Sequence, residues 1–337
     1  MIDISSAKVT KLIVHRIGNK LRDEGFTLSE HEIDHASTLD GLLLRNYLSA
    51  GIKLGELYDF YHESDLSLNV INHFSNLIFQ NPDTFAEHTK SIAKHLYSAS
   101  THPNIGGGEF ISILFDDIRT EDGPRQALGM FRIEGKSDYL DVKIEDNSFQ
   151  VIERLGISLE KIQKGAVAIS DSKNVYVVDS LGQKTKYWLD SFLKVVPSKT
   201  PLVCAKAAGS FLKAISKKVK SPEAALAFCH QLQSSLTDGE SLSFGEIKKL
   251  SASFIDNEQI CEVLAGISNK SGLEMSDNIE IDTRQLTRYA RDVVKKSWIA
   301  DGISVVIADQ NANISSVEVV RNESGIRAVI DIQLKGV

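Results

Sequence analysis

The sequence predicts an α+β protein, and three observations lead to this fold class. Between residues 28 and 97 apolar residues recur with helical spacing, and between 109 and 179 the period becomes that of strands joined by short polar turns. Strands that follow one another through short turns form an antiparallel sheet. After residue 197 helical spacing returns, and the chain ends in short alternating segments.

The first predicted domain covers residues 1–196 and combines a helical N-terminal layer with an antiparallel sheet. The helical segments at 28–97 include DGLLLRNYL, LNVINHFSNLIF and DTFAEHTKSIAKHLY, the last of which is opened by Pro82 and Asp83, a favourable helix start. The expected strands are EFISILFDDI, QALGMFRIEG and YLDVKIEDNSF, followed by a hairpin of GAVAIS and NVYVVD. A helix at 184–195 ends the domain, and PSKTP at 197–201 has the composition of a linker.

The second predicted domain, residues 197–337, is a helical bundle that ends in a small β-meander. Its helices are the amphipathic segments PLVCAKAAGSFLKAISKKVK, SPEAALAFCHQLQSSL, SFGEIKKLSASF, DNEQICEVLAGI and DTRQLTRYARDVVKK. The three expected strands of the meander are ISVVIAD, ISSVEVVRN and GIRAVIDIQL, which Asn- and Gly-containing turns separate.

The last of these helices carries a stripe of positive charge. At 100° per residue, its basic residues fall within about 60° of one another, and an apolar group lies on the opposite side. Asp282 is placed to cap the N-terminus. The basic stripe consists of Arg284, Arg288, Arg291 and Lys295. It is either a DNA-facing surface or a solvated outer face.

A second basic region lies in the middle of an acidic chain. The net charge is −7, yet residues 151–220 contain 13 Lys and Arg against 5 Asp and Glu. Attraction to phosphate depends on local potential, so an acidic protein with one basic surface can bind DNA. The candidate DNA contacts in this region are Lys184 and Lys186, beside Tyr187 and Trp188, and Lys213, Lys217, Lys218 and Lys220.

Two short motifs are typical of metal sites. HEIDH, His31 to His35, matches the zinc pattern HExxH, but the polar residues around it favour a solvated helical turn capped by Ser29. DYLDVK contains the D-x-K element of Mg²⁺-dependent nucleases through Asp141 and Lys143, with Glu109 or Asp116 as a second carboxylate. A half-exposed strand also explains this alternation. We therefore assign no metal ligand, no catalytic residue and no cofactor.

Composition places the chain among soluble cytoplasmic proteins. No apolar run of about 18 residues and no signal-peptide pattern occurs, which predicts no membrane association. The Gly-rich IGGGE at 105–109 lacks the spacing of a phosphate-binding loop and is expected to be a turn. Cys204, Cys229 and Cys261 are far apart and are expected to be small core residues.

At RQLTRYA (284–290), YLDVK (139–143) and TKYWLDSFLKV (185–195) the sequence resembles the bacterial 37-kilodalton nucleoid-associated proteins, the NdpA/YejK-like family. The family RQLT corresponds to Arg284–Thr287, and its YLD to Tyr139–Asp141. The resemblance implies a cytoplasmic protein of the nucleoid that binds double-stranded DNA, directly or through a partner protein.

The leading hypothesis is therefore a non-enzymatic nucleoid-associated protein that contacts DNA phosphates with little sequence specificity. Two alternatives stay open. One is an interaction protein that a partner recruits to the nucleoid, and the other is a Mg²⁺-dependent nuclease. Whether the chain forms a homo-oligomer also stays open.

Overall fold

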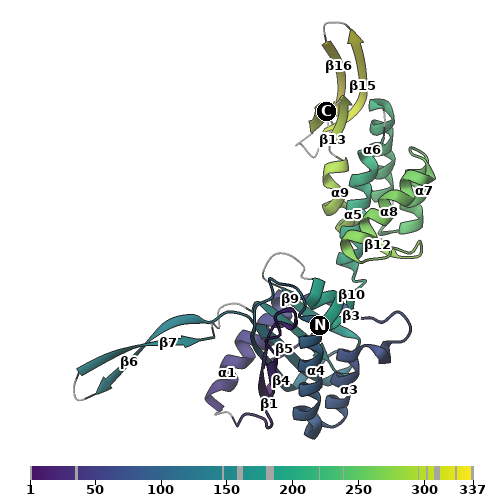
Figure 1. The fold of residues 1–337 in the computed structure, drawn as a ribbon. Helices are drawn as coiled ribbons and strands as arrows, with labels where there is room; N and C mark the ends of the chain where they lie inside the picture. The colour runs from purple at the N-terminus through teal and green to yellow at the C-terminus, as the bar shows by residue number, and fades with distance from the viewer. Residues whose placement is uncertain are drawn as a thin grey trace. The chain divides into compact units, whose positions relative to one another are not determined.

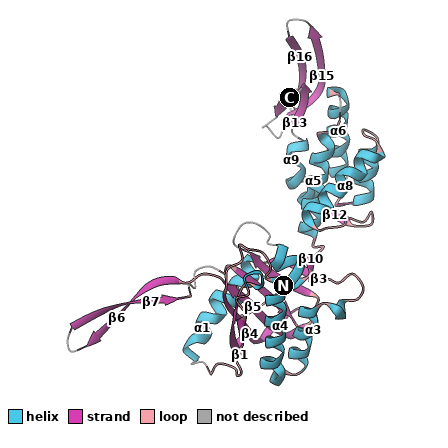
Figure 2. Cartoon of the chain, viewed as in Figure 1, coloured by secondary structure: helices cyan, strands magenta, loops and turns pink. Residues whose placement is uncertain are grey.

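The computed structural model describes residues 2–34, 37–145, 148–157, 162–179, 186–219, 221–237, 239–294, 296–300, 303–306, 312–322 and 325–334. The chain forms two compact units, Met1–Ser198 and Lys199–Val337, and each is described by itself. The division falls within the PSKTP segment. Figures 1 and 2 show the elements of both units.

An eight-stranded antiparallel sheet forms the centre of the first unit. Strands that are close in sequence pair as hairpins, β4 with β5 and β8 with β9, as the alternating segments predict. This sheet and the helices packed on it confirm the α+β class. In sheet order the strands are β10 (Val195–Pro197), β3 (Glu56–Phe60), β9 (Asn174–Asp179), β8 (Lys164–Ile169), β5 (Gly123–Ile133), β4 (Gly108–Thr120), β1 (Lys8–Ile17) and β2 (Phe26–Thr27).

Two of these strands differ from the expected order of elements. The opening of the chain, to which we assigned no element, supplies β1 inside the sheet between β4 and β2. The stretch 28–97, expected to be helical, is interrupted by β3, which pairs with β9 and β10. Both strands pair with segments about 100 residues or more away, and local periodicity contains no information about such partners.

Helices cover both faces of the sheet. Buried side chains of β4 alternate between the faces, so that Phe110 and Leu114 join one core while Ile111, Ile113 and Phe115 join the other. Burial on both sides explains why these strands read as nearly continuous apolar runs. The first face is covered by α3 (Val70–Gln80), α4 (Phe85–Ala99) and η6 (Tyr187–Leu193), and the second by α1 (Asp40–Leu43), η3 (Leu44–Ser49) and α2 (Ala50–Leu54).

Short helical turns complete this unit, and the described part of the HEIDH segment, residues 31–34, is not part of any of them. Residues 30 and 31 form a bend and residues 32–34 have no regular structure, so the expected helical turn is wrong for the described residues, and His35 lies outside them. The Ser29 hydroxyl donates to the Val14 carbonyl instead of capping a helix. The short turns are η1 (Lys20–Arg22), η2 (Ser37–Leu39), η4 (Leu66–Leu68) and η5 (Pro82–Thr84).

A separate hairpin replaces the single strand expected at YLDVKIEDNSF. Strands β6 (Ser137–Glu145) and β7 (Ser148–Gly156) pair with each other and with no strand of the eight-stranded sheet. They extend away from that sheet in Figure 1. Strand β6 ends at Glu145 and β7 begins at Ser148, and strand spacing alone does not distinguish two paired strands from one continuous strand.

The second unit contains the expected helices around a core of its own. Phe211, Phe228, Phe244 and Leu286 are among its fully or almost fully buried side chains. Two short strands, β11 (Ser241–Ser243) and β12 (Glu280–Asp282), pair beside the bundle. The helices are α5 (Pro201–Ser216), α6 (Pro222–Thr237), α7 (Phe244–Ala252), α8 (Asn257–Ser271) and α9 (Thr283–Val294).

The C-terminal strands form two hairpins rather than a three-strand meander. Strand β13 (Lys296–Ala300) pairs with β14 (Ile303–Val306), and β15 (Ala312–Asn322) pairs with β16 (Gly325–Leu334). The segment DTRQLTRYARDVVKK predicts a helix as far as Lys296, but β13 begins at this residue. The second hairpin packs on α6, where His230 Nε2 lies 2.6 Å from the Ile314 carbonyl oxygen.

The cysteines follow the expectation in part. Cys204 and Cys229 are buried, and burial raises the pKa of Cys229 to about 11, so this thiol stays protonated. Cys261 is exposed on α8, which corrects its assignment to the core.

Candidate nucleic-acid interface

Helix α9 has the amphipathic form that its spacing predicts. The Asp282 carboxylate accepts the backbone N–H of Gln285 at 2.8 Å, which satisfies an otherwise unpaired donor of the first turn. Leu286 and Ala290 are fully buried and Val293 nearly so, which anchors the apolar side in the bundle. This anchoring fixes which residues of α9 face outward.

The outward face of α9 carries three arginines. Arg284, Arg288 and Arg291 are all exposed. Within the described part of the chain, no ion pair joins any of them to a carboxylate. Lys295, the fourth residue of the predicted stripe, lies outside the described residues. Three guanidinium groups are therefore available to an external anion.

Helix α5 and its C-cap residue, Lys217, carry lysines along one side. Lys206 and Lys217 are exposed, and Lys213 is about half-exposed. Their separations of seven and four residues place them on one helix face. Lys218 points elsewhere and pairs with Glu262 of α8 at 2.7 Å. Lys220 lies outside the described residues.

The basic sides of α5 and α9 are neighbours. Lys213 Nζ lies 2.9 Å from Asp292 Oδ2, one residue beyond Arg291 on α9. The two helices approach closely at Gly209, where an added Cβ would lie 2.5 Å from Tyr289 Cβ. We call the six cations of α5, its C-cap residue and α9 the α5–α9 basic surface: Lys206, Lys213, Lys217, Arg284, Arg288 and Arg291.

Lys206 is not among the predicted contacts, although its spacing along the sequence places it with them. It stands seven residues before Lys213, the separation of two helical turns. Lys186 is exposed just before η6, but it belongs to the first unit and not to the α5–α9 basic surface. Lys184 lies outside the described residues. Of the predicted contacts, the structure thus brings together Lys213, Lys217 and the three arginines.

The three carboxylates that the nuclease hypothesis would use as metal ligands each form an ion pair or hydrogen bond with a nearby side chain. Asp141 Oδ2 lies 3.4 Å from Arg154 Nε and 3.9 Å from Lys143 Nζ. Glu109 pairs with Lys136 at 2.7 Å, and Asp116 accepts a hydrogen bond from the Gln126 amide at 2.7 Å. Among the described residues, no three His, Cys, Asp or Glu side chains are grouped so that they could hold a metal ion.

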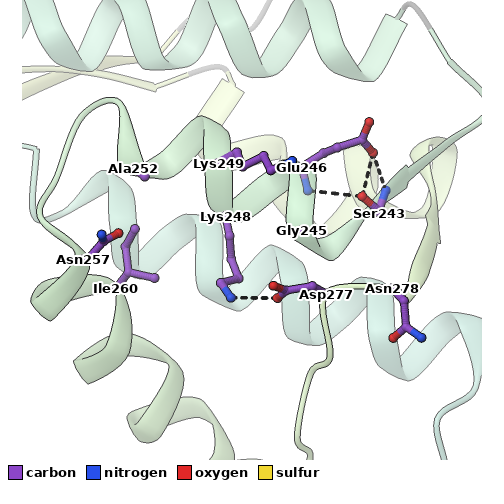
Figure 3. A pocket seen from close by; sticks show the side chains of 10 residues that line it. All are labelled: Ser243, Gly245, Glu246, Lys248, Lys249, Ala252, Asn257, Ile260, Asp277 and Asn278. Atoms are coloured by element: carbon purple, nitrogen blue, oxygen red, sulfur yellow. Dashed lines mark hydrogen bonds and ion pairs between the residues drawn. The ribbon is translucent and has the colours of Figure 1, made fainter.

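A pocket of about 550 Å³ lies between α7, α8 and the segment before β12 (Figure 3). Its polar groups largely engage one another. Lys248 pairs with Asp277 at 2.7 Å, and Glu246 accepts the Ser243 backbone N–H at 2.8 Å in a capping box. These contacts stabilise the start of α7, and they leave few polar groups to orient a ligand.

Comparison with known proteins identifies the family. The family model of nucleoid-associated protein YejK matches residues 13–325, nearly the whole chain. The chain belongs to this family. The YejK family match extends over both units and the α5–α9 basic surface, and it assigns the chain a nucleoid-associated role. A search of curated proteins finds no significant match. Within the described residues, no helix has the length and apolar character needed to span a membrane.

Proposed function

We propose that this nucleoid-associated protein binds the phosphate backbone of double-stranded DNA through the α5–α9 basic surface, without catalysis. One observation carries the proposal. Within the described residues, no carboxylate forms an ion pair with Arg284, Arg288 or Arg291, and the opposite side of their helix is anchored in the core. A planar guanidinium group can donate two parallel hydrogen bonds to a phosphate, and it loses less entropy per hydrogen bond than a lysine does.

The form of the surface favours phosphate contact over base reading. The cations extend along two neighbouring helices, and α9 alone is about 18 Å long at 1.5 Å per residue. Lysines deliver charge without selecting bases, and phosphate contacts position a protein on the duplex. We therefore expect weakly specific, salt-sensitive binding, in which each neutralised phosphate releases counterions.

The test is fluorescence-anisotropy binding to a random-sequence duplex across a salt series, with Mg²⁺ and with EDTA. Binding should weaken linearly in the logarithm of salt concentration and need no metal. Replacing Arg288 and Arg291 by Gln should lower the salt slope by about two and weaken affinity for all sequences alike.

A matched control comes from the same unit. Lys248→Gln with Lys249→Gln removes the same charge from α7, which stands apart from α9 in Figure 1. This control should bind DNA nearly as the unchanged protein does. Equal loss in both variants would show that net charge, and not the α5–α9 basic surface, governs binding.

Recruitment by a partner is the second candidate, and the net charge of −7 favours it. In that case the purified chain would not bind duplex DNA even at low salt. The arginines of α9 would then contact a protein, and capture of the chain on DNA would require the partner. Duplex cleavage that requires Mg²⁺ would instead contradict the non-enzymatic assignment.

A further inference from the structure

The β6–β7 hairpin has one apolar and one polar face, and its register defines both. Residues paired across the ladder share a face, and successive residues alternate. Val142 opposite Val151 and Ile144 opposite Phe149 therefore lie on one side near the turn, with Leu140 and Leu155 further along the same side. The other side contains mainly polar residues, including Asp141, Lys143, Gln150, Ser148 and Arg154.

The apolar face is open to solvent. Its six hydrophobic residues, Leu140, Val142, Ile144, Phe149, Val151 and Leu155, are between 57% and 75% exposed. The strands of the eight-stranded sheet, in contrast, are covered on both faces. An isolated two-stranded hairpin is marginally stable in water, so such a face requires a partner surface.

The charge of this hairpin disfavours phosphate-rich partners. Its two strands carry the acids Asp138, Asp141, Glu145 and Glu153 but only two bases, Lys143 and Arg154. The excess of negative charge repels nucleic acid and anionic lipid surfaces. The partner surface is therefore expected to be protein.

We propose that the apolar face of β6–β7 packs against the same face of a second copy of this chain. A two-fold dimer needs one self-complementary patch, and the uncharged apolar half of this face near the turn meets this condition. A stable interface buries about 800 Å² on each partner. Six large side chains exposed to this degree, with the residues around them, provide an area of this order.

The positions of the two acidic residues on this face favour one relative orientation of the two hairpins. Asp138 and Glu153 lie on the half away from the turn, opposite Leu155 and Leu140, whereas the half near the turn has no charged residue among its four described members. Two hairpins that point in opposite directions bring the uncharged halves together and keep Asp138 and Glu153 away from the centre. Like charges are then not buried against each other.

Sedimentation velocity of the full chain over a wide concentration range tests the dimer. The unchanged protein should associate to a dimer, and the variant Ile144→Asp with Phe149→Asp should dissociate about 100-fold more readily or more, as for residues at the centre of an interface. The control Ser148→Asp with Gln150→Asp adds the same charge on the opposite face and should remain dimeric. Circular dichroism should be alike for all three, because the changed side chains are exposed.

A photoreactive benzoylphenylalanine in place of Phe149 provides an independent measurement. Irradiation should yield a cross-linked dimer in which the partner peptide comes from residues 137–156. A monomer at every concentration, equal dissociation of the two double variants, or cross-links to another part of the chain would each overturn the proposal.

Discussion

His15 on β1 is a titratable residue whose protonation opposes folding. It is 1% exposed, and its Nδ1 accepts the backbone N–H of Ser29 at 3.2 Å. Burial lowers the pKa of His15 to about 4 from its ordinary value of 6.5, and the nearby Lys90 contributes in the same direction. The folded protein therefore holds the neutral imidazole, which suits the acceptor role of Nδ1.

A pH dependence of stability follows from this shift. Between pH 6.5 and 4 the unfolded chain binds a proton that the folded chain does not, so the contribution of His15 is complete above pH 6.5 and is lost as the pH falls. The free energy of unfolding should fall by roughly 3 kcal/mol at most over this window, at about 1.4 kcal/mol per pH unit. Urea unfolding at a series of pH values measures it.

The variant His15→Asn separates the pH dependence due to His15 from the pH dependence due to the carboxylates. It keeps an acceptor near the Ser29 N–H and does not titrate, so its pH profile should be flatter below pH 6.5 than that of the unchanged protein. Parallel profiles would mean that His15 has the same pKa in the folded and unfolded chains.

At the scale of elements, the α5–α9 basic surface depends on how closely two helices pack. Gly209 on α5 faces the backbone and Cβ of Tyr289, and the neighbouring Ala205 and Ala208 are fully buried. Small residues allow the axes to approach, which keeps the lysines of α5 beside the arginines of α9. The pairing of Lys213 with Asp292 lies at this junction.

Substitution Gly209→Ala should therefore destabilise the second unit. The added methyl group would lie 2.5 Å from Tyr289 Cβ and 3.0 Å from the Tyr289 carbonyl carbon, so one helix must move. Overpacking of this kind costs about 1–3 kcal/mol, more than the gain in helix propensity. The matched control is Gly266→Ala on α8, where, outside the adjoining turns of α8 itself, no atom of the described residues lies within 4 Å of the new Cβ, and it should be neutral or stabilising. Chemical denaturation of the two variants compares them.

At the scale of the whole molecule, the chain has separate hydrophobic cores in its two units. Among the residues that the structure describes, the buried residues of the main core of the second unit are all distinct from those of the two cores that flank the eight-stranded sheet. We propose that each unit folds on its own core. The family match covers both, so a nucleoid-associated role belongs to the chain as a whole.

Calorimetry of the full chain should then show two unfolding transitions. Because a multidomain protein need not unfold in one step, Gly209→Ala should lower one transition by several degrees and leave the other in place. Displacement of both transitions by the same amount would indicate that the units unfold together.

Elements with a strong local pattern could be predicted from the sequence. The helices of the second unit, the hairpins β4–β5 and β8–β9, and the Asp282 cap on α9 all follow from the period of apolar residues or from residue types at helix ends. The arginines of α9 belong to this group, because a helix with one apolar side leaves only one side for charge.

Features that depend on distant partners required the tertiary structure. The position of β1 beside β4, the separation of β6–β7 from the sheet, and the neighbouring positions of Lys213 and Asp292 each join residues that no local window contains. Local periodicity reports which side of an element is buried, because burial repeats along the chain. It does not report which element covers that side, because this choice is made by packing between segments far apart in sequence.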